Sequence, residues 1–191
     1  GEGRCAMTRA EWERRKDEPH EYLPAGGLLV DLFNAGLVGP RKLNLLGANA
    51  FRAGTGDRLS EYDALIRADG AGVWRGEATF RVANPLMCAL INTARPCYGP
   101  LSRQGGVHKE VIGYPLHPMP GPGVCHDPDV KRIALHIHKR MAFKQLPILA
   151  DACEDAGLDD DELLAHLRDT KAKHVRGCWA LDLVMGRDPR E

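Results

Sequence analysis

The 191-residue chain has few aromatic side chains, which make up 6% of its residues. Aliphatic side chains must therefore supply most of any core. Neither sign of charge is in excess, because 26 Lys and Arg residues balance 26 Asp and Glu residues. This balance excludes a strong overall attraction to nucleic acid or to an anionic membrane, while local basic patches remain compatible with it.

Long apolar runs are also missing. No stretch approaches the ~20 apolar residues needed to span a bilayer. The opening residues, GEGRCAMTRAEWERRKDE, contain no apolar core of a signal peptide. We therefore expect a soluble, cytoplasmic protein without membrane association. Thr8 and Glu11 form a capping box that starts a short helix, so we expect Met7 to be the natural start and residues 1–6 a disordered extension.

The six cysteines lack the CxxC spacing of many metal and redox sites. Three of them fall among apolar positions of predicted helices, where free cysteine behaves as a small buried hydrophobe. We therefore expect reduced structural thiols, as in a reducing compartment. GxSxG, HExxH, Walker and EF-hand patterns are also absent, which removes the usual motif-based enzyme assignments.

Helix signals along the chain predict a mainly α fold. Alternating apolar and polar residues at 73–82 fit a strand or a small β-hairpin within it. Dense prolines and glycines, as in HPMPGPG, predict an irregular segment before the last third of the chain. We expect four parts in one compact domain: the extension at 1–6, an N-terminal helical region at 7–96, an irregular Pro/Gly-rich loop at 97–126, and a C-terminal antiparallel helical subdomain at 127–187.

The C-terminal subdomain has the clearest signals. Asp127 and Pro128 are an N-cap and an N1 proline, and apolar residues then recur at 130, 133, 134, 137 and 141 on one helix face. A second helix opens at Pro147 and ends at Gly157. Asp159 or Asp160 caps a third helix, and residues 175–185 form a fourth, in which Trp179 is a core anchor and Cys178 a buried thiol. The short connections favour antiparallel neighbours.

A zinc site is the first chemical hypothesis. Five of the eight histidines lie between positions 108 and 138, and zinc takes nitrogen, sulfur or oxygen ligands in a tetrahedral array. His136 and His138 are two residues apart on a helix, so they face different directions and cannot chelate together. The candidate ligands are Cys97, His117, Cys125 and His126, although their spacing matches no recognised zinc motif.

A cysteine nucleophile is the second hypothesis. Cys125 lies near the predicted helix start at Asp127, where the helix dipole would lower the pKa of its thiol. His126 is the adjacent candidate base. The competing interpretation is that these are ordinary loop and surface side chains.

A basic surface is the third hypothesis. Lys131 lies on the exposed face of the first C-terminal helix, and a basic segment follows the third: Arg168, Lys171, Lys173 and Arg176. Brought together in space, these residues could hold phosphate or an acidic partner. The segment lacks the interleaved aromatics of single-strand binders, which argues against nucleic acid.

The stretch LPILADACEDAGLDDDELLAHLRDTKAKHVRGCWALDLVMGR resembles the C-terminus of a large group of uncharacterised bacterial proteins. Those proteins read like PILADALEEAG…LLAHCR…HVRGCWVLDLLLGK and often begin MTEAEW, where this chain has MTRAEW. They have FGNPFRP where this chain has IGYPLHPMP, so the resemblance is weaker there. It implies a bacterial cytoplasmic protein that starts at Met7, and it supplies no reaction.

Taken together, these patterns favour a non-enzymatic module that binds an unidentified protein partner. Its expected contact surfaces are the loop at 97–124 and the basic segment at 168–176. The alternative is a metal- or cysteine-dependent enzyme centred on His117, Cys125 and His126, with zinc as the expected metal. A phosphate or nucleic-acid binder that uses Arg168–Arg176 is the second alternative.

Overall fold

The computed structural model describes residues 8–15, 32, 35–39, 41–43, 45–46, 49, 69 and 107–188. Within these residues the chain is helical and contains no strand, which confirms the predicted mainly α fold. The hairpin predicted for 73–82 lies outside them. The named helices are α1 (Arg9–Arg15), α6 (Val107–Ile112), α7 (Pro122–His126), α8 (Pro128–Arg140), α9 (Leu146–Asp155), α10 (Asp161–Arg168) and α11 (Trp179–Val184), with a 3-10 turn, η2, at Phe143–Gln145.

The caps of the C-terminal helices form as predicted. The Asp127 carboxylate accepts hydrogen bonds from the first backbone N–H groups of α8, and Asp160 accepts one at the start of α10. Gly157 has a φ of 90° and ends α9. No helix in the described part of the chain is long and apolar enough to cross a membrane.

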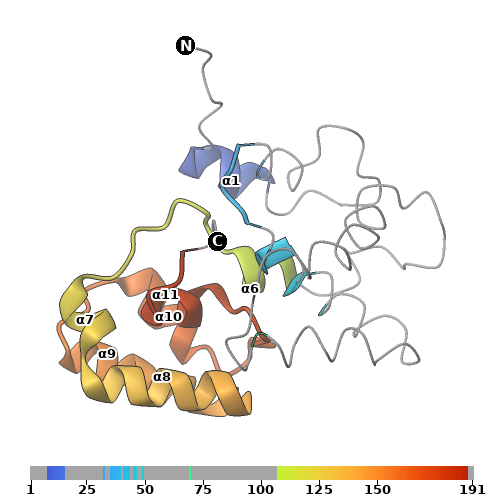
Figure 1. The fold of residues 1–191 in the computed structure, drawn as a ribbon. Helices are drawn as coiled ribbons and strands as arrows, with labels where there is room; N and C mark the ends of the chain where they lie inside the picture. Colours follow the sequence, from blue (N-terminus) through green and yellow to red (C-terminus); the bar gives the residue numbers. More distant parts are fainter. Residues whose placement is uncertain are drawn as a thin grey trace, which may run out of the picture.

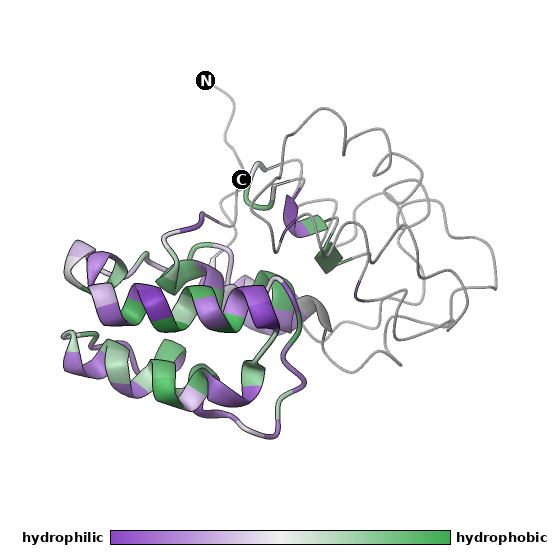
Figure 2. Cartoon of the chain, turned by 60° about the horizontal axis from the view of Figure 1, so that its bottom comes forward, coloured by the Kyte–Doolittle hydropathy of each residue, from purple (hydrophilic) through white to green (hydrophobic). Residues whose placement is uncertain are grey.

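Helices α8 to α11 enclose the main core (Figure 1). Helix α9 packs against α8 and α10, and α11 contacts both α8 and α10. Hydrophobic and hydrophilic residues alternate in narrow bands along these helices, as expected for amphipathic helices with one buried face (Figure 2). Their buried residues include Val130, Ala134 and Ile137 of α8, Leu149, Ala150 and Cys153 of α9, Leu163, Leu164 and Leu167 of α10, and Trp179 of α11.

The last helix is shorter than predicted. We expected residues 175–185, whereas α11 begins at Trp179. Gly177 takes a left-handed φ of 90°, and Cys178 is extended with φ −45° and ψ 123°. These conformations break a helix, and together they turn Cys178 back towards α10.

We predicted an irregular loop at 97–126, and the structure contradicts this prediction at two places. Residues Val107–Ile112 form α6, and residues Pro122–His126 form α7. Helix α6 has the sequence VHKEVI, which contains neither proline nor glycine, and Pro122 stands in the first turn of α7, where its fixed φ suits a helix. The prediction missed both helices because it took the high proline and glycine content of the whole segment to exclude every helix within it. Helix α6 contacts α11 and packs with residues of the N-terminal region: Trp12, Leu32, Val38, Leu43, Leu45 and Leu46.

Gly113 sets the contact between α6 and α11. Its φ is 59°, and a Cβ atom at this position would lie 2.4 Å from Cγ of Trp179. No side chain fits in that space, so glycine lets the end of α6 lie directly against the Trp179 ring. This contact fixes Glu110 of α6 relative to the start of α11.

Candidate metal centre

Four side chains with metal-binding groups meet between α6, α10 and α11. Glu110, His166, His174 and Cys178 each offer one ligand atom, and these atoms all lie within 4.8 Å of one another. Glu110 comes from α6, His166 from α10, and the other two from the segment between α10 and α11. We call these four residues the ligand cluster. Within the described residues, it is the one such group of three or more candidate ligands.

Local structure explains how the ligand cluster is assembled. His166 lies beside the buried Leu163–Leu167 face of α10, so its ring is directed along the edge of the core. The turn at Gly177 is closed by a hydrogen bond from the Cys178 N–H to the Val175 carbonyl, and the Cys178 thiol lies beside Nε2 of His166. The Asp169 carbonyl lies 3.0 Å from Nε2 of His174 and holds the imidazole in place.

The Glu110 carboxylate is the centre of the cluster. Its Oε1 lies 2.9 Å from Nδ1 of His174, and its Oε2 lies 3.3 Å from Nε2 of His166. The same His166 nitrogen is 3.4 Å from Sγ of Cys178. All four potential ligand atoms therefore lie next to one another across three separate segments.

The surroundings shift the pKa values of these groups. Burial alone would raise the pKa of the Glu110 carboxyl, but hydrogen bonds and charge from His166 and His174 lower it to about 2. Burial opposes the charged form of His174, yet Glu110 raises its pKa. Both His174 nitrogens face oxygen acceptors, and both can donate hydrogen bonds only when each carries a proton. Burial, reinforced by the Glu110 charge, raises the pKa of the Cys178 thiol well above its usual value.

The donor set and its spacing fit zinc. Zinc bonds of about 2.0–2.3 Å to N, O and S place tetrahedral ligand atoms about 3.3–3.8 Å apart. The three neighbouring pairs in the cluster are 2.9, 3.3 and 3.4 Å apart, and the widest separation is within 4.8 Å. Side-chain shifts of about 1 Å would therefore close the cluster around an ion.

Two cavities flank the cluster. One of about 360 Å³ reaches Glu110 and His166, and another of about 660 Å³ reaches His174. Asp169, Ala172 and Lys173 line both cavities, so this segment forms the wall between them. The ligand cluster therefore borders two cavities, although its side chains are largely buried.

The ligands predicted from sequence do not assemble into this centre. The His117 ring lies tilted against the Trp179 ring, with centroids 4.9 Å apart, and its Nε2 lies 3.6 Å from Oδ2 of Asp160. His126 is exposed, and Cys97 lies outside the described residues. The predicted low pKa of Cys125 is wrong: the residue lies in the last turn of α7, burial raises the pKa of its thiol, and its sulfur contacts the carbonyls of Pro120 and Leu183.

The predicted basic surface is divided by the fold. Lys131, Lys171 and Lys173 are exposed, and the exposed Arg168 bonds to Asp151 and Glu154 of α9. Arg176 is 5% exposed, which removes it from any outer contact surface. Its position follows from the Gly177 turn, which carries the residues before Cys178 into the interior.

The sequence offered a partial signal for the true cluster. The HVRGC string places His174 four residues before Cys178, and His166 lies in the last turn of the preceding helix. Glu110 is 56 residues upstream of His166, and no local pattern reveals that their segments meet. The chain matches no protein-family model, no curated protein and no solved structure.

Proposed function

We propose that this protein is a non-enzymatic interaction module whose C-terminal helices are clamped by a divalent transition metal, with zinc the best fit. The observation that carries the proposal is the convergence of Glu110, His166, His174 and Cys178 within 4.8 Å. A thiol, two imidazoles and a carboxylate are the donors zinc prefers. Four protein ligands fill a tetrahedral shell, which favours a structural role over a catalytic one.

The surroundings of the ligands also suit a metal. The second ring nitrogen of His174 is held by the Asp169 carbonyl, the kind of outer contact that orients metal-bound histidine. The Lys42 ammonium favours the ionised form of Cys178, which is the form that binds zinc. A metal would displace protons from Cys178 and His174, so its affinity should rise with pH.

The clamp would order the predicted contact surface. Lys171 and Lys173 lie on the exposed segment between His166 and His174, which are two of the proposed ligands. Fixing both ends of this segment would lower the entropy lost when a partner protein binds it. The positive side chains there suit an acidic partner surface.

Metal content is the direct test. We expect protein purified without chelator to carry about one zinc per chain, and its cobalt form to show the intense charge-transfer absorption of a thiolate ligand. Cys178→Ser should abolish that absorption. Cys153→Ser is the matched control, because Cys153 is equally buried in the same core but is not one of the four candidate ligands. The clamp would be refuted if the protein bound neither zinc nor cobalt tightly. It would also be refuted if the Cys178→Ser variant still bound these metals tightly.

The ordering of the contact surface has its own test. Hydrogen exchange at residues 168–178 should slow when zinc is added to metal-free protein, whereas exchange in α9 should change little. If residues 168–178 exchanged equally fast with and without bound zinc, the proposal that the metal orders the contact surface would be contradicted. Metal binding itself would not be affected by that result.

A further inference from the structure

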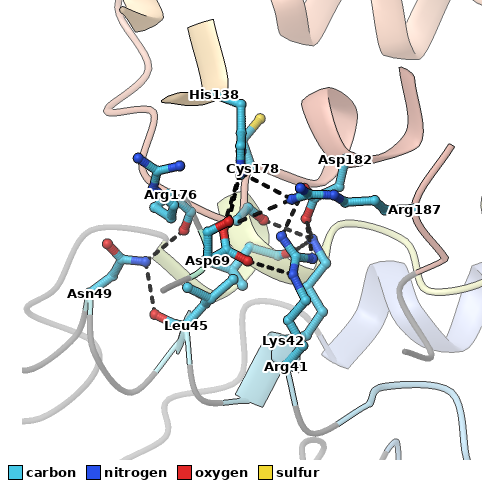
Figure 3. Close-up of polar contacts among 12 residues, drawn as sticks. Arg41, Lys42, Leu45, Asn49, Asp69, His138, Arg176, Cys178, Asp182 and Arg187 are labelled. Carbon is cyan, nitrogen blue, oxygen red and sulfur yellow. Dashed lines mark hydrogen bonds and ion pairs between the residues drawn. The ribbon is translucent and has the colours of Figure 1, made fainter. Parts of the chain in front are cut away.

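A second polar cluster, separate from the ligand cluster, lies between α8, α11 and the N-terminal region (Figure 3). Asp182 of α11 is at its centre, 2.8 Å from Arg41, 2.6 Å from Lys42 and 3.5 Å from Arg187. Asp69 lies 2.6 Å from Arg41. We call the whole group the charge cluster: Arg41, Lys42, Asp69, His138, Arg176, Asp182 and Arg187.

The charge cluster holds more positive than negative charge. Its four cations are Arg41, Lys42, Arg176 and Arg187, and its two carboxylates are Asp69 and Asp182, which leaves a surplus of two positive charges among the described residues. Lys42 donates to the Val111 carbonyl, the Gly177 carbonyl and Asp182 at 2.6–2.8 Å. Three acceptors require three N–H groups, so Lys42 is an ammonium ion.

His138 does not offset this surplus. Burial, followed by the charge of Arg187, lowers the pKa of His138, so its imidazole is neutral near pH 7. Its Nε2 lies 3.1 Å from the Asp69 carbonyl and 3.3 Å from Nη1 of Arg187. The ring therefore fills a polar position in the cluster without adding charge of either sign.

Arg176 carries the unbalanced charge. It is 5% exposed, its Nε and Nη1 atoms have no hydrogen-bond partner, and it forms no ion pair with a described residue. Figure 3 shows its guanidinium turned away from Asp69 and Asp182, while its backbone carbonyl accepts a hydrogen bond from Asn49. A buried, unpaired guanidinium is costly, so Arg176 is the cation that lacks a counter-charge among the described residues.

A water molecule does not resolve this arrangement. Oδ2 of Asp69 also lacks a hydrogen-bond partner, and separate buried waters could satisfy this atom and the Arg176 N–H groups. Water would leave the surplus of two positive charges among the described residues, where the repulsion between buried charges is weakly screened. A negatively charged ligand satisfies the N–H groups and the charge together.

We propose that the charge cluster binds a dianionic phosphate group, either inorganic phosphate or the end of a small phosphate monoester, with Arg176 as its principal partner. A phosphate monoester carries about −1.5 to −2 charges near pH 7, and a positively charged site favours the dianion, whose charge offsets the surplus. Its oxygens accept from guanidinium N–H groups in charge-assisted hydrogen bonds. Arg187 is the second cation at the site, and its side chain is 24% exposed, so it marks the solvent side.

The test is thermal unfolding of the full chain with added anions at matched ionic strength. Inorganic phosphate should raise the unfolding midpoint and saturate as a single site does. Glycerol phosphate distinguishes the two sources: an equal rise identifies a monoester site, and no rise identifies a site for free phosphate. Acetate and chloride should have little effect, and a rise of equal size with either would overturn the proposal.

Matched variants locate the effect. Arg176→Met should abolish the response to phosphate, whereas Arg168→Met removes an exposed arginine and should keep it. If Arg176→Met fails to fold, calorimetric titration of the wild-type chain decides, with one phosphate per chain expected and none overturning the site. These measurements are made on protein of one fixed metal content, because Arg176 lies between His174 and Cys178 of the ligand cluster. A phosphate response retained by folded Arg176→Met would refute the assignment.

Discussion

The ligand cluster and the charge cluster share the segment around α11 but balance their charges in opposite ways. In the ligand cluster, the Glu110 carboxylate lies between the imidazoles of His166 and His174, and it raises the pKa of His174. In the charge cluster the cations are three arginines and Lys42; burial lowers the pKa of Lys42, while three hydrogen-bond acceptors hold its ammonium form. We therefore expect the ligand cluster to respond to pH and metal, and the charge cluster to anions.

We expect the largest loss of unfolding free energy from a substitution at the centre of the charge cluster, and this loss tests whether the cluster is rigid. Asp182→Asn removes a carboxylate that contacts Arg41 and Lys42, and leaves both cations buried without their shared partner. Breaking a buried pair in this way costs ~3–5 kcal/mol. Denaturant unfolding should show that loss, while Asp151→Asn, at an exposed partner of Arg168, should change little. A small loss at Asp182 would mean that the cluster rearranges, and the contrast between the clusters would disappear.

The pH dependence of the metal-free protein tests the adjustable character of the ligand cluster. The pKa of Glu110 is lowered from 4.5 to about 2, so its stabilisation is present above its usual value and is lost as pH falls towards 2. The raised pKa of His174 adds stability that is present below its usual 6.5 and is lost as pH rises through the raised value. The full effect of the pair therefore lies between about pH 4.5 and 6.5.

Glu110→Gln measures this contribution. A shift of about 2.5 pKa units corresponds to a free energy of unfolding on the order of 3 kcal/mol. The variant should lose stability most between about pH 4.5 and 6.5, and the difference from wild type should shrink at lower pH. Unfolding curves of both proteins across this range provide the measurement. A difference that is independent of pH would show that Glu110 acts by packing rather than by charge.

A smaller effect concerns the packing that brings Glu110 to the ligand cluster. Gly113→Ala would place a Cβ against the Trp179 ring, and overpacking of this kind costs ~1–3 kcal/mol beyond the backbone strain. Gly157→Ala is the control, because Gly157 also has a positive φ, whereas a Cβ added there would meet no atom within 4 Å. The difference in unfolding free energy between the two variants isolates the clash. Equal losses would mean that the Trp179 ring moves aside without cost.

The sequence predicted the parts of the fold that local chemistry determines. Asp127, Asp160 and Gly157 act through neighbouring backbone groups, so their caps were readable from a few adjacent residues. The ligand cluster depends on α6 reaching α10, a contact between distant segments that no local pattern encodes. Cys125 was predicted as a nucleophile because it lies near a helix start, a local signal, whereas the residues that meet in space come from segments separated by turns at Gly113 and Gly177.

We expect the smallest change in the unfolding midpoint from Arg168→Met, and comparing it with Arg176→Met distinguishes an exposed arginine from a buried one. Arg168 and Arg176 belong to the same basic segment of the sequence, yet Arg168 is solvent-exposed beside two exposed carboxylates, and Arg176 is 5% exposed. Arg168→Met should leave the unfolding midpoint nearly unchanged, and added salt should remove any residual difference because exposed pairs are screened. Arg176→Met should instead change stability in phosphate-free buffer, because it removes a buried charge together with its packing. Matching midpoints for the two variants would show that burial does not separate these arginines, and the phosphate site would then lose the feature that distinguishes it from ordinary surface charge.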